Sequence, residues 1–299
     1  MMRGWHPNVR RASPVVTLSL AFLPLAAVVT DTSAAQSPRT IYISADMEGI
    51  AGLSDTQDAV GRRLMTLEVN AAVVGAFEGG ATSVVVNDAH GSHANLLQED
   101  LDPRARLLRG SLKPYGMMQG LEASHAGVVF IGYHGRAGSL GSFAAHTGSG
   151  RVADLRVNGR SVGEGGMNLL YAAWYRVPVI FVSGDDVAVQ QVREMVPGVT
   201  GVPVKTGIWN SAVVTLSPDS ARAAIRRGVA DAVREIASRP QRPGSPFNVE
   251  LEYASSLFAD IAEGIPGVAR RGPTTVAFSD NEYPAAYRMI RVLYKHLQP

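Results

Sequence analysis

The chain has 299 residues, 46% of them hydrophobic, with no cysteine and a formal net charge of +2. This length and composition allow one large α/β domain or two modest ones. Without cysteine there is no disulfide, and any metal must be held by His, Asp and Glu. Residues 1–35 carry three arginines against one aspartate, so the remainder is close to neutral. A near-neutral chain lacks the charge pattern of a protein that binds nucleic acid or anionic lipid.

The N-terminus has the pattern of an export signal. Arg10-Arg11 forms a basic region, Val15 to Val29 is mostly apolar, and small residues precede and include Ala35. This arrangement predicts a signal peptide over 1–35, cleaved after Ala35, and a periplasmic or secreted protein that leaves the membrane after cleavage. An uncleaved anchor is the alternative, although the run is short for a bilayer span of about 20 residues. The arginine pair does not distinguish Sec from twin-arginine export.

Beyond this segment, strand and helix patterns alternate along the chain. β-Branched, aromatic or continuous apolar runs predict strands over 40–44, 83–86, 127–131 and 179–182. Helical spacing or capping predicts helices over 64–77, 167–175 and 217–236. Strands separated by helices are typical of α/β proteins, so we expect a mostly parallel sheet flanked by helices.

The second half of the chain carries signals of a different kind. Asn158-Gly159, between Leu155-Arg156-Val157 and Arg160-Ser161-Val162, is the preferred pair for a type I′ hairpin turn. The proline-rich stretch over 239–246 indicates a linker. We therefore expect a metal-binding catalytic α/β domain over 36–238. A smaller C-terminal α+β portion over 239–299 would pack on it, with strands near 249–253 and 274–278 and a helix over 284–296.

Acidic and histidine residues follow the predicted strands. Asp46 and Glu48 come directly after the first strand, His90 follows the second, and His134 follows the third. Ligands of open parallel sheets bind at the carboxyl ends of the strands, so these side chains are expected to converge. Two carboxylates two residues apart on extended backbone share a face and repel unless a cation or a proton neutralises one.

A divalent metal is the economical explanation for this set. Glu164, surrounded by glycines at the start of a predicted helix, can approach the same crevice as a further ligand. Oxygen and nitrogen ligands without sulfur suit zinc and, less well, manganese or cobalt. Five ligands exceed the three that one catalytic zinc uses, which favours two metals with a bridging carboxylate. Taken singly, each residue could instead be a helix cap, a surface residue or a core histidine.

Three further positions have open interpretations. His146 lies in a stretch rich in Gly, Ala and Ser, where it could act as a general acid or base or remain an ordinary loop residue. Asp185-Asp186 could orient a ligand or bind an amine, and Lys205 could act as an electrophile. Both could equally be capping or surface groups.

Four segments together resemble one known family. They are Ser44-Ala45-Asp46-Met47-Glu48-Gly49-Ile50, Val86-Asn87-Asp88-Ala89-His90, Ile131-Gly132-Tyr133-His134 and Val162-Gly163-Glu164. In this order they resemble the D-aminopeptidase family of the DppA type (peptidase family M55), and the resemblance runs from about residue 40 to 293. Four collinear motifs are far more specific than one.

The resemblance implies a binuclear zinc aminopeptidase, with two Zn²⁺ per subunit, acting on short peptides with an N-terminal D-amino acid such as D-Ala-D-Ala. It implies metal ligands at Asp46, Glu48, His90, His134 and Glu164, with Asp46 as the bridge. It also implies a catalytic role for His146 and a ring-like homo-oligomer. The export signal and the Gly/Ala-rich loop before His146 depart from the prototype, so substrate and stereospecificity are less firmly implied than metal-dependent peptide hydrolysis.

Two alternatives stay open at this point. One is a metal-dependent amidase or esterase acting on a non-peptide or cell-wall substrate. The other is a periplasmic protein that binds metal without turnover. An aminopeptidase needs a substrate with a free amine, and this requirement separates it from the first alternative.

Overall fold

The computed structural model describes residues 1–5, 8, 11–14, 38–55, 59–236 and 238–297. Residues 1–37 and 38–299 are two separate units, and every described helix and strand belongs to the second. The expected apolar run over 15–29 and the cleavage site after Ala35 lie outside the described residues, so the signal peptide stays a prediction. No helix among the described residues combines the length and apolarity that a bilayer span requires.

The larger of two sheets has seven strands in the order β3-β2-β1-β4-β7-β8-β9. All neighbours run parallel except β9, which pairs antiparallel with β8. The predicted mostly parallel sheet is therefore confirmed. The strands are β1 (Thr40–Ala45), β2 (Ser83–Asp88), β3 (Ala105–Leu108), β4 (Gly127–Tyr133), β7 (Val179–Asp185), β8 (Thr200–Trp209) and β9 (Ala212–Thr215).

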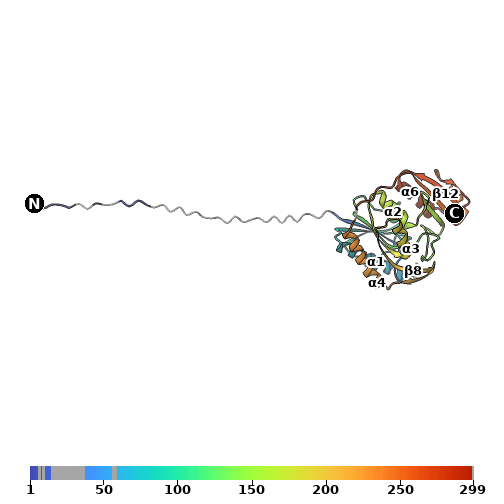
Figure 1. Ribbon diagram of the computed structural model, residues 1–299, viewed down its shortest axis with the longest axis horizontal. Helices are drawn as coiled ribbons and strands as arrows, with labels where there is room; N and C mark the ends of the chain where they lie inside the picture. Colours follow the sequence, from blue (N-terminus) through green and yellow to red (C-terminus); the bar gives the residue numbers. More distant parts are fainter. Residues whose placement is uncertain (6–7, 9–10, 15–37, 56–58, 237, 298–299) are drawn as a thin grey trace. The chain divides into compact units, whose positions relative to one another are not determined.

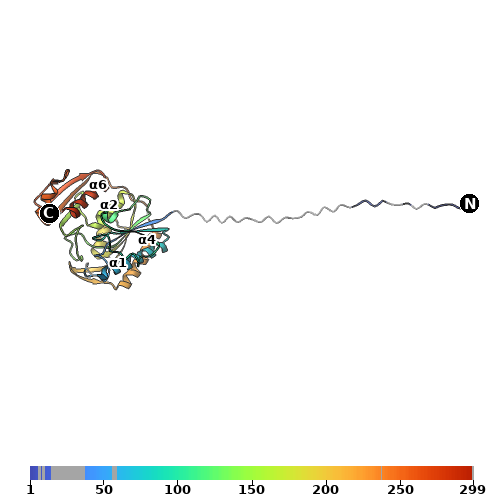
Figure 2. The same cartoon turned by 180° about the vertical axis from the view of Figure 1, so that it is seen from behind.

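Both faces of this sheet are buried, because side chains alternate along each strand. Ile41 and Ile43 pack in one core with α1 (Ala59–Glu78) and α4 (Pro218–Arg234). Tyr42 and Phe130 pack in the other core, which also holds residues of α2 and α3. Figures 1 and 2 show α1 and α4 side by side on one side of the sheet, and Figure 1 shows α2 and α3 on the other. Their bounds are Glu164–Trp174 for α2 and Asp186–Met195 for α3.

The smaller sheet is antiparallel, in the order β11-β12-β10-β5-β6. It takes strands from both sides of the boundary expected at residue 238, because the predicted hairpin pairs with the C-terminal strands. That hairpin turns at Asn158 and Gly159, whose φ angles of 50° and 78° suit a type I′ turn. The strands are β5 (Val152–Val157), β6 (Arg160–Ser161), β10 (Phe247–Tyr253), β11 (Ala269–Arg270) and β12 (Thr275–Asp280).

Helices α5 (Ser256–Ala262) and α6 (Tyr283–Arg291) pack against this second sheet. The chain after α6 continues as a π-helical turn over Val292–His296, so the predicted helix over 284–296 is present but changes its hydrogen bonding near the end. The hydroxyl of Tyr283 donates to the Met167 carbonyl of α2 at 2.9 Å. This contact fixes the C-terminal helix against the element that begins at Glu164.

Several short elements were absent from the sequence prediction. Helix α3 begins immediately after β7. Asp185 is the last residue of the strand and the cap of the helix, and Asp186 is the first residue of the helix. Strands β8 and β9 alternate irregularly between exposed and buried positions, so their sequences contain no continuous apolar run that would predict a strand. The 3₁₀ helix Gly116–Met118 and strand β3 are only three and four residues long.

The order of strands reverses between β1 and β4, which is where ligands of open α/β sheets bind. The turn after β1 lies directly against β4 at this point. The N–H of Gly49 donates to the carbonyl of Gly132 at 2.8 Å. A Cβ at position 49 would overlap the Tyr133 carbonyl oxygen, so only glycine permits the approach.

Replacing Gly49 with alanine should therefore push the turn carrying Asp46 and Glu48 away from β4. We expect a loss of unfolding free energy of about 1–3 kcal/mol, as for other overpacked sites, together with lower zinc content. Chemical denaturation and elemental analysis measure the two effects. Gly150→Ala is the matched control, because a Cβ there meets no atom within 4 Å. Equal stability and zinc content in the two variants would refute this constraint.

Candidate metal centre

Five of the six predicted site residues line one pocket of ≈ 260 Å³ at the carboxyl edge of the parallel sheet, and the sixth, His134, is buried beside them. These six residues come from five separate parts of the chain. The turn after β1 supplies Asp46 and Glu48, and the turn after β2 supplies His90. His134 follows β4, His146 lies in the loop between β4 and β5, and Glu164 is the first residue of α2.

The Asp46 carboxylate faces two groups of side chains, one with each oxygen. Its Oδ1 lies 3.2 Å from His90 Nδ1, which is also 3.0 Å from Glu48 Oε2. Its Oδ2 lies 3.6 Å from His134 Nε2, which is also 3.4 Å from Glu164 Oε2. Two sets of potential metal ligands thus share Asp46, as a bridging carboxylate requires.

The spacing and the unpaired atoms of the pocket fit a metal ion. Zinc holds N and O ligands at about 2.0–2.1 Å, so neighbouring ligands of a tetrahedron lie about 3.3 Å apart. The separations above scatter around that value. Asp46 Oδ2 and His134 Nε2 are buried without a hydrogen-bond partner among the described residues, although buried polar atoms are normally paired. A cation between them would satisfy both atoms.

The electrostatics of the pocket follow from three buried carboxylates in one place. Burial, reinforced by the charge of Glu48, raises the pKa of Asp46 well above its usual value. Burial alone would also raise the pKa of Glu164, but the positive charge of the neighbouring His134 imidazolium lowers it to about 2. Burial disfavours the charged form of His90, but the hydrogen bonds that its Nδ1–H donates to Asp46 and Glu48 raise its pKa to about 10. Protonated imidazoles thus supply the positive charge that the acids demand, and a metal would replace those protons.

His134 and His146 are oriented by backbone carbonyls. Nδ1 of His134 lies 3.0 Å from the Gly135 carbonyl, and Nδ1 of His146 lies 2.8 Å from the Ala144 carbonyl. In the neutral ring, an Nδ1–H that donates to a carbonyl leaves Nε2 as the free acceptor. The two rings stack with centroids 4.3 Å apart, and His146 Nε2 lies 3.5 Å from Glu164 Oε1. His146 therefore turns Nε2, rather than Nδ1, toward Glu164 at the margin of the candidate metal site.

Asp88 organises the turn that presents His90. Its Oδ2 accepts the N–H groups of Asn95 and Leu96 at 2.6 and 2.7 Å, and Asn95 Nδ2 donates to the His90 carbonyl. A buried carboxylate with this many donors holds the turn in a single conformation. The Asp in the Asn-Asp-Ala-His segment thus supports the turn without facing the pocket.

Asp185 and Lys205 are buried supports of neighbouring loops. Asp185 accepts from the N–H of Ala188 to cap α3, and from the Ser142 hydroxyl in the loop that carries His146. Lys205 Nζ donates to the carbonyls of Glu48 and Leu53 at 2.8 and 2.7 Å. Asp185 is thus the cap that the sequence left open as one alternative, and neither side chain lines the candidate pocket. The roles considered as amine binder and electrophile stay predictions.

Among the pocket residues absent from the predicted site are three from the C-terminal segment: Arg291, Tyr294 and Lys295. All come from the C-terminal helix and the turn that follows it. Their spacing of three and four residues places them on one helical face, which is the signal that could have grouped them. The sequence does not indicate that this face turns toward the parallel sheet.

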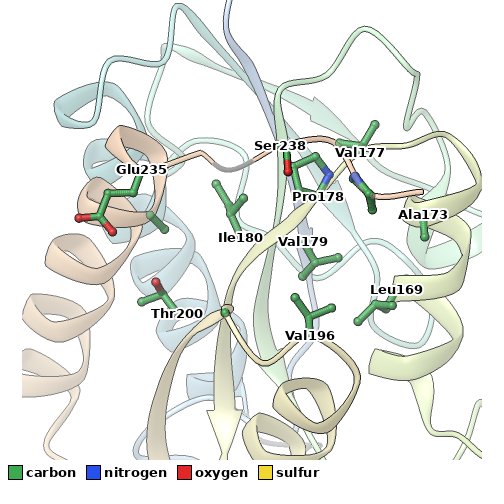
Figure 3. A pocket seen from close by; sticks show the side chains of 13 residues that line it. Leu169, Ala173, Val177, Pro178, Val179, Ile180, Val196, Thr200, Glu235 and Ser238 are labelled. Carbon is green, nitrogen blue, oxygen red and sulfur yellow. The ribbon is translucent and has the colours of Figure 1, made fainter. Parts of the chain in front are cut away.

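A second cavity, of ≈ 220 Å³, lies at the amino ends of β7 and β8. Figure 3 shows apolar side chains such as Leu169, Val179 and Val196 on its wall, with the Glu235 carboxylate at its margin. Among the described residues that line it, Glu235 is the only acidic one and there is no histidine. The groups of residues that could hold a metal ion lie instead at the carboxyl edge.

The comparison with known families agrees with this geometry. The model of the M55 peptidase family, described as D-aminopeptidase, matches residues 40–292. The chain belongs to the D-aminopeptidase family. It is thus a member of a family of peptide-bond hydrolases, and the match covers every residue of the candidate centre.

Individual relatives support the same assignment. A D-aminopeptidase of Bacillus subtilis (strain 168) is 37% identical over 263 residues, which are 85% of this chain and 96% of that protein. A solved structure described as the Zn-dependent D-aminopeptidase DppA from Bacillus subtilis, a self-compartmentalizing protease, superposes with a TM-score of 0.81. It is 36% identical, and the match covers 85% of this chain and 96% of that one. The fold predicted from the sequence is thus found in a family member.

Glu68 of α1 is a buried acid behind the turn that presents Glu48. Its Oε1 accepts the N–H of Ala51 at 2.8 Å, and its Oε2 is buried without a partner among the described residues. Burial raises the pKa of Glu68 to about 8, against the opposing effects of the Ala51 hydrogen bond and Lys205. As the pH rises, the unfolded chain therefore loses the Glu68 proton at about pH 4.3, whereas the native protein keeps it until about pH 8.

The stability that protonated Glu68 contributes should be complete below about pH 4.3 and lost as the pH rises toward 8. Glu68→Gln keeps an acceptor for Ala51 and cannot ionise, so its stability should fall less over this window and exceed that of wild type above pH 8. Urea denaturation at several pH values measures the difference. The exposed Glu99→Gln variant is the control and should follow wild type. Parallel profiles for Glu68→Gln and wild type would contradict the prediction.

Proposed function

We propose that this protein is a zinc-dependent aminopeptidase that hydrolyses short peptides with an N-terminal D-amino acid, such as D-Ala-D-Ala. In this proposal two Zn²⁺ ions occupy the centre formed by Asp46, Glu48, His90, His134 and Glu164. The observation that carries the proposal is the position of Asp46, whose two oxygens face two separate sets of ligands. Membership of the family and the zinc dependence of the relative DppA support the same metal and activity.

The ligand histidines are oriented to bind metal through different nitrogens. His90 faces the carboxylates with Nδ1, whereas His134 faces them with Nε2 and keeps Nδ1 on a backbone carbonyl. Bound zinc would supply Lewis-acid activation of the scissile carbonyl and of the attacking water. The carboxylates of Glu48 and Glu164 compensate the metal charge in a buried setting, where such interactions are strong.

His146 is the residue that we propose to move protons. Its Nδ1 lies against the Ala144 carbonyl, so Nε2 is the ring nitrogen that faces Glu164 in the pocket, and the side chain is 25% exposed. From this position it can accept a proton from the attacking water and return it to the amine that leaves. General acid–base catalysis of this kind contributes roughly 10²- to 10⁴-fold to the rate.

The remaining parts of the proposal concern assembly and location. DppA is described as self-compartmentalizing, which supports a ring-like homo-oligomer for this relative of it. The N-terminal export pattern supports a periplasmic or secreted enzyme. An exported enzyme of this type would act on free peptides outside the cytoplasm, without nucleic-acid or membrane partners after signal cleavage.

Replacing His146 with alanine should leave the metal content at two zinc ions per chain and lower kcat for D-Ala-D-Ala by about 10²- to 10⁴-fold. The metal stays because the five ligands are intact, whereas proton transfer is lost. Elemental analysis beside a steady-state assay gives both values. His296→Ala, at an exposed position, is the control.

Full activity of His146→Ala would remove that residue from the mechanism. A panel of D- and L-aminoacyl peptides beside N-acylated analogues tests the activity itself. The proposal predicts hydrolysis only where the amine is free and greatest where the first residue is D. Hydrolysis of acylated substrates would favour the amidase interpretation, and bound zinc without any hydrolysis would favour a metal-binding protein.

A further inference from the structure

Arg291, the last residue of α6, is a buried cation without an acidic partner. Its side chain belongs to a residue only 4% exposed, and its Nε has no hydrogen-bond partner in the described part of the chain. The one polar contact of its guanidinium is a distance of 3.5 Å from Nη1 to the Tyr294 hydroxyl. No carboxylate of the described residues lies within ion-pair distance of it. A guanidinium is always charged, and its burial is costly unless an anion compensates it.

Arg291 lines the same pocket as the candidate metal ligands. The carboxylates of Asp46, Glu48 and Glu164 gather at one part of the wall, and Arg291 and Lys295 are contributed by the C-terminal helical segment. Lys295 already donates to the Gly91 carbonyl at 3.1 Å. Arg291 is the more deeply buried of these two cations, and its Nε has no acceptor among the described residues.

The neighbouring Lys113 does not compete for this role. Its Nζ donates to the Asn87 side chain and to the Asp88 carbonyl, both at 2.6 Å. These two acceptors hold the ammonium below the pocket, and Lys113 is not among the residues that line it. In the described part of the chain, Arg291 is therefore the buried cation of this pocket whose guanidinium has no carboxylate or carbonyl acceptor.

The position of the guanidinium is fixed by the backbone around it. It packs against Gly116, where any Cβ would overlap it. On its other side Tyr294 packs on Gly148, whose N–H donates to Glu164 Oε1 at 2.7 Å. Burial raises the pKa of Tyr294 to about 12, with Arg291 opposing the shift and Glu164 and Asp46 adding to it. The hydroxyl of Tyr294 thus lies close enough to both Arg291 and the acids for their charges to affect its pKa.

We propose that Arg291 binds the C-terminal carboxylate of the substrate and so selects free dipeptides over their amides. The inference rests on the proposed aminopeptidase function and adds the group that recognises the other end of the substrate. A free dipeptide carries an ammonium and a carboxylate separated by two residues, at most about 7 Å of chain. Its amine matches the acidic metal centre and its carboxylate matches Arg291, whose forked donors bind carboxylates in bidentate fashion.

Steady-state kinetics of the zinc-loaded protein with D-Ala-D-Ala and with D-Ala-D-Ala amide test this assignment. Wild type should have a kcat/KM for the free acid that is on the order of 10- to 100-fold higher than for the amide. This ratio corresponds to the free energy of a charge-assisted hydrogen bond. Arg291→Met should lose this preference, mainly through a higher KM for the free acid, with little change for the amide. Arg291→Lys should retain part of it. Arg288→Met, at an exposed position of the same helix, should match wild type.

Equal kcat/KM for the two substrates in wild type would overturn the inference, whatever the stability of the variants. So would an Arg291→Met variant that loses both activities equally and keeps the ratio, because that result indicates a purely structural role. Calorimetric binding of D-Ala-D-Ala provides a readout without turnover, and Arg291→Met should bind it at least tenfold more weakly. Unchanged affinity would contradict the role of Arg291. An absence of hydrolysis with Arg291-dependent binding would instead contradict the aminopeptidase function.

Discussion

Three buried carboxylates in one pocket impose the constraint on which the rest of this structure depends. Asp46, Glu48 and Glu164 are each less than a tenth exposed, and the repulsion among them must be balanced by positive charge. In the protein alone, His90 and His134 provide it as imidazolium groups, and their pKa values are raised by the acids they face. Two divalent cations would satisfy the same demand and would also pair the buried Asp46 Oδ2 and His134 Nε2.

The fold produces this concentration of charge through the topology of its parallel sheet. Strands β1, β2 and β4 are neighbours, so the residues that follow them emerge at one edge although they are about 40 residues apart in sequence. Gly49 allows the first turn to approach β4, and Lys205 and Asp185 hold the adjacent loops. Helix α6, which packs against the antiparallel sheet, contributes Arg291 to the wall of the pocket. The antiparallel sheet therefore contributes to the site indirectly, by positioning that helix.

Much of the site could be anticipated from the sequence because strand ends are local signals. Apolar strands followed at once by Asp46, His90 and His134 show both the element and the end at which its chemistry lies. Once the sheet is assumed to be parallel, convergence of these residues follows. The same reasoning recovered the hairpin at Asn158-Gly159, where the turn residues dictate the backbone conformation.

The remainder depends on packing between distant elements, which local patterns do not encode. Lys205 and Asp185 have the residue types of functional groups, and only their buried partners show them to be supports. For Arg291 the residue type is misleading in the other direction. A basic residue near the end of a predicted helix indicates an ordinary favourable interaction with the helix dipole, not a place in a pocket. The boundary expected at residue 238 was placed by composition, whereas the antiparallel sheet joins strands from either side of it.

The central claim is that one carboxylate, Asp46, joins two metal positions. A crystal structure of the zinc-loaded protein, with anomalous diffraction recorded on both sides of the zinc absorption edge, tests it most directly. The account predicts two anomalous peaks about 3.5–4 Å apart, one between His90 and Glu48 and the other between His134 and Glu164, with an oxygen of Asp46 on each. A single peak, or zinc bound away from these side chains, would contradict it.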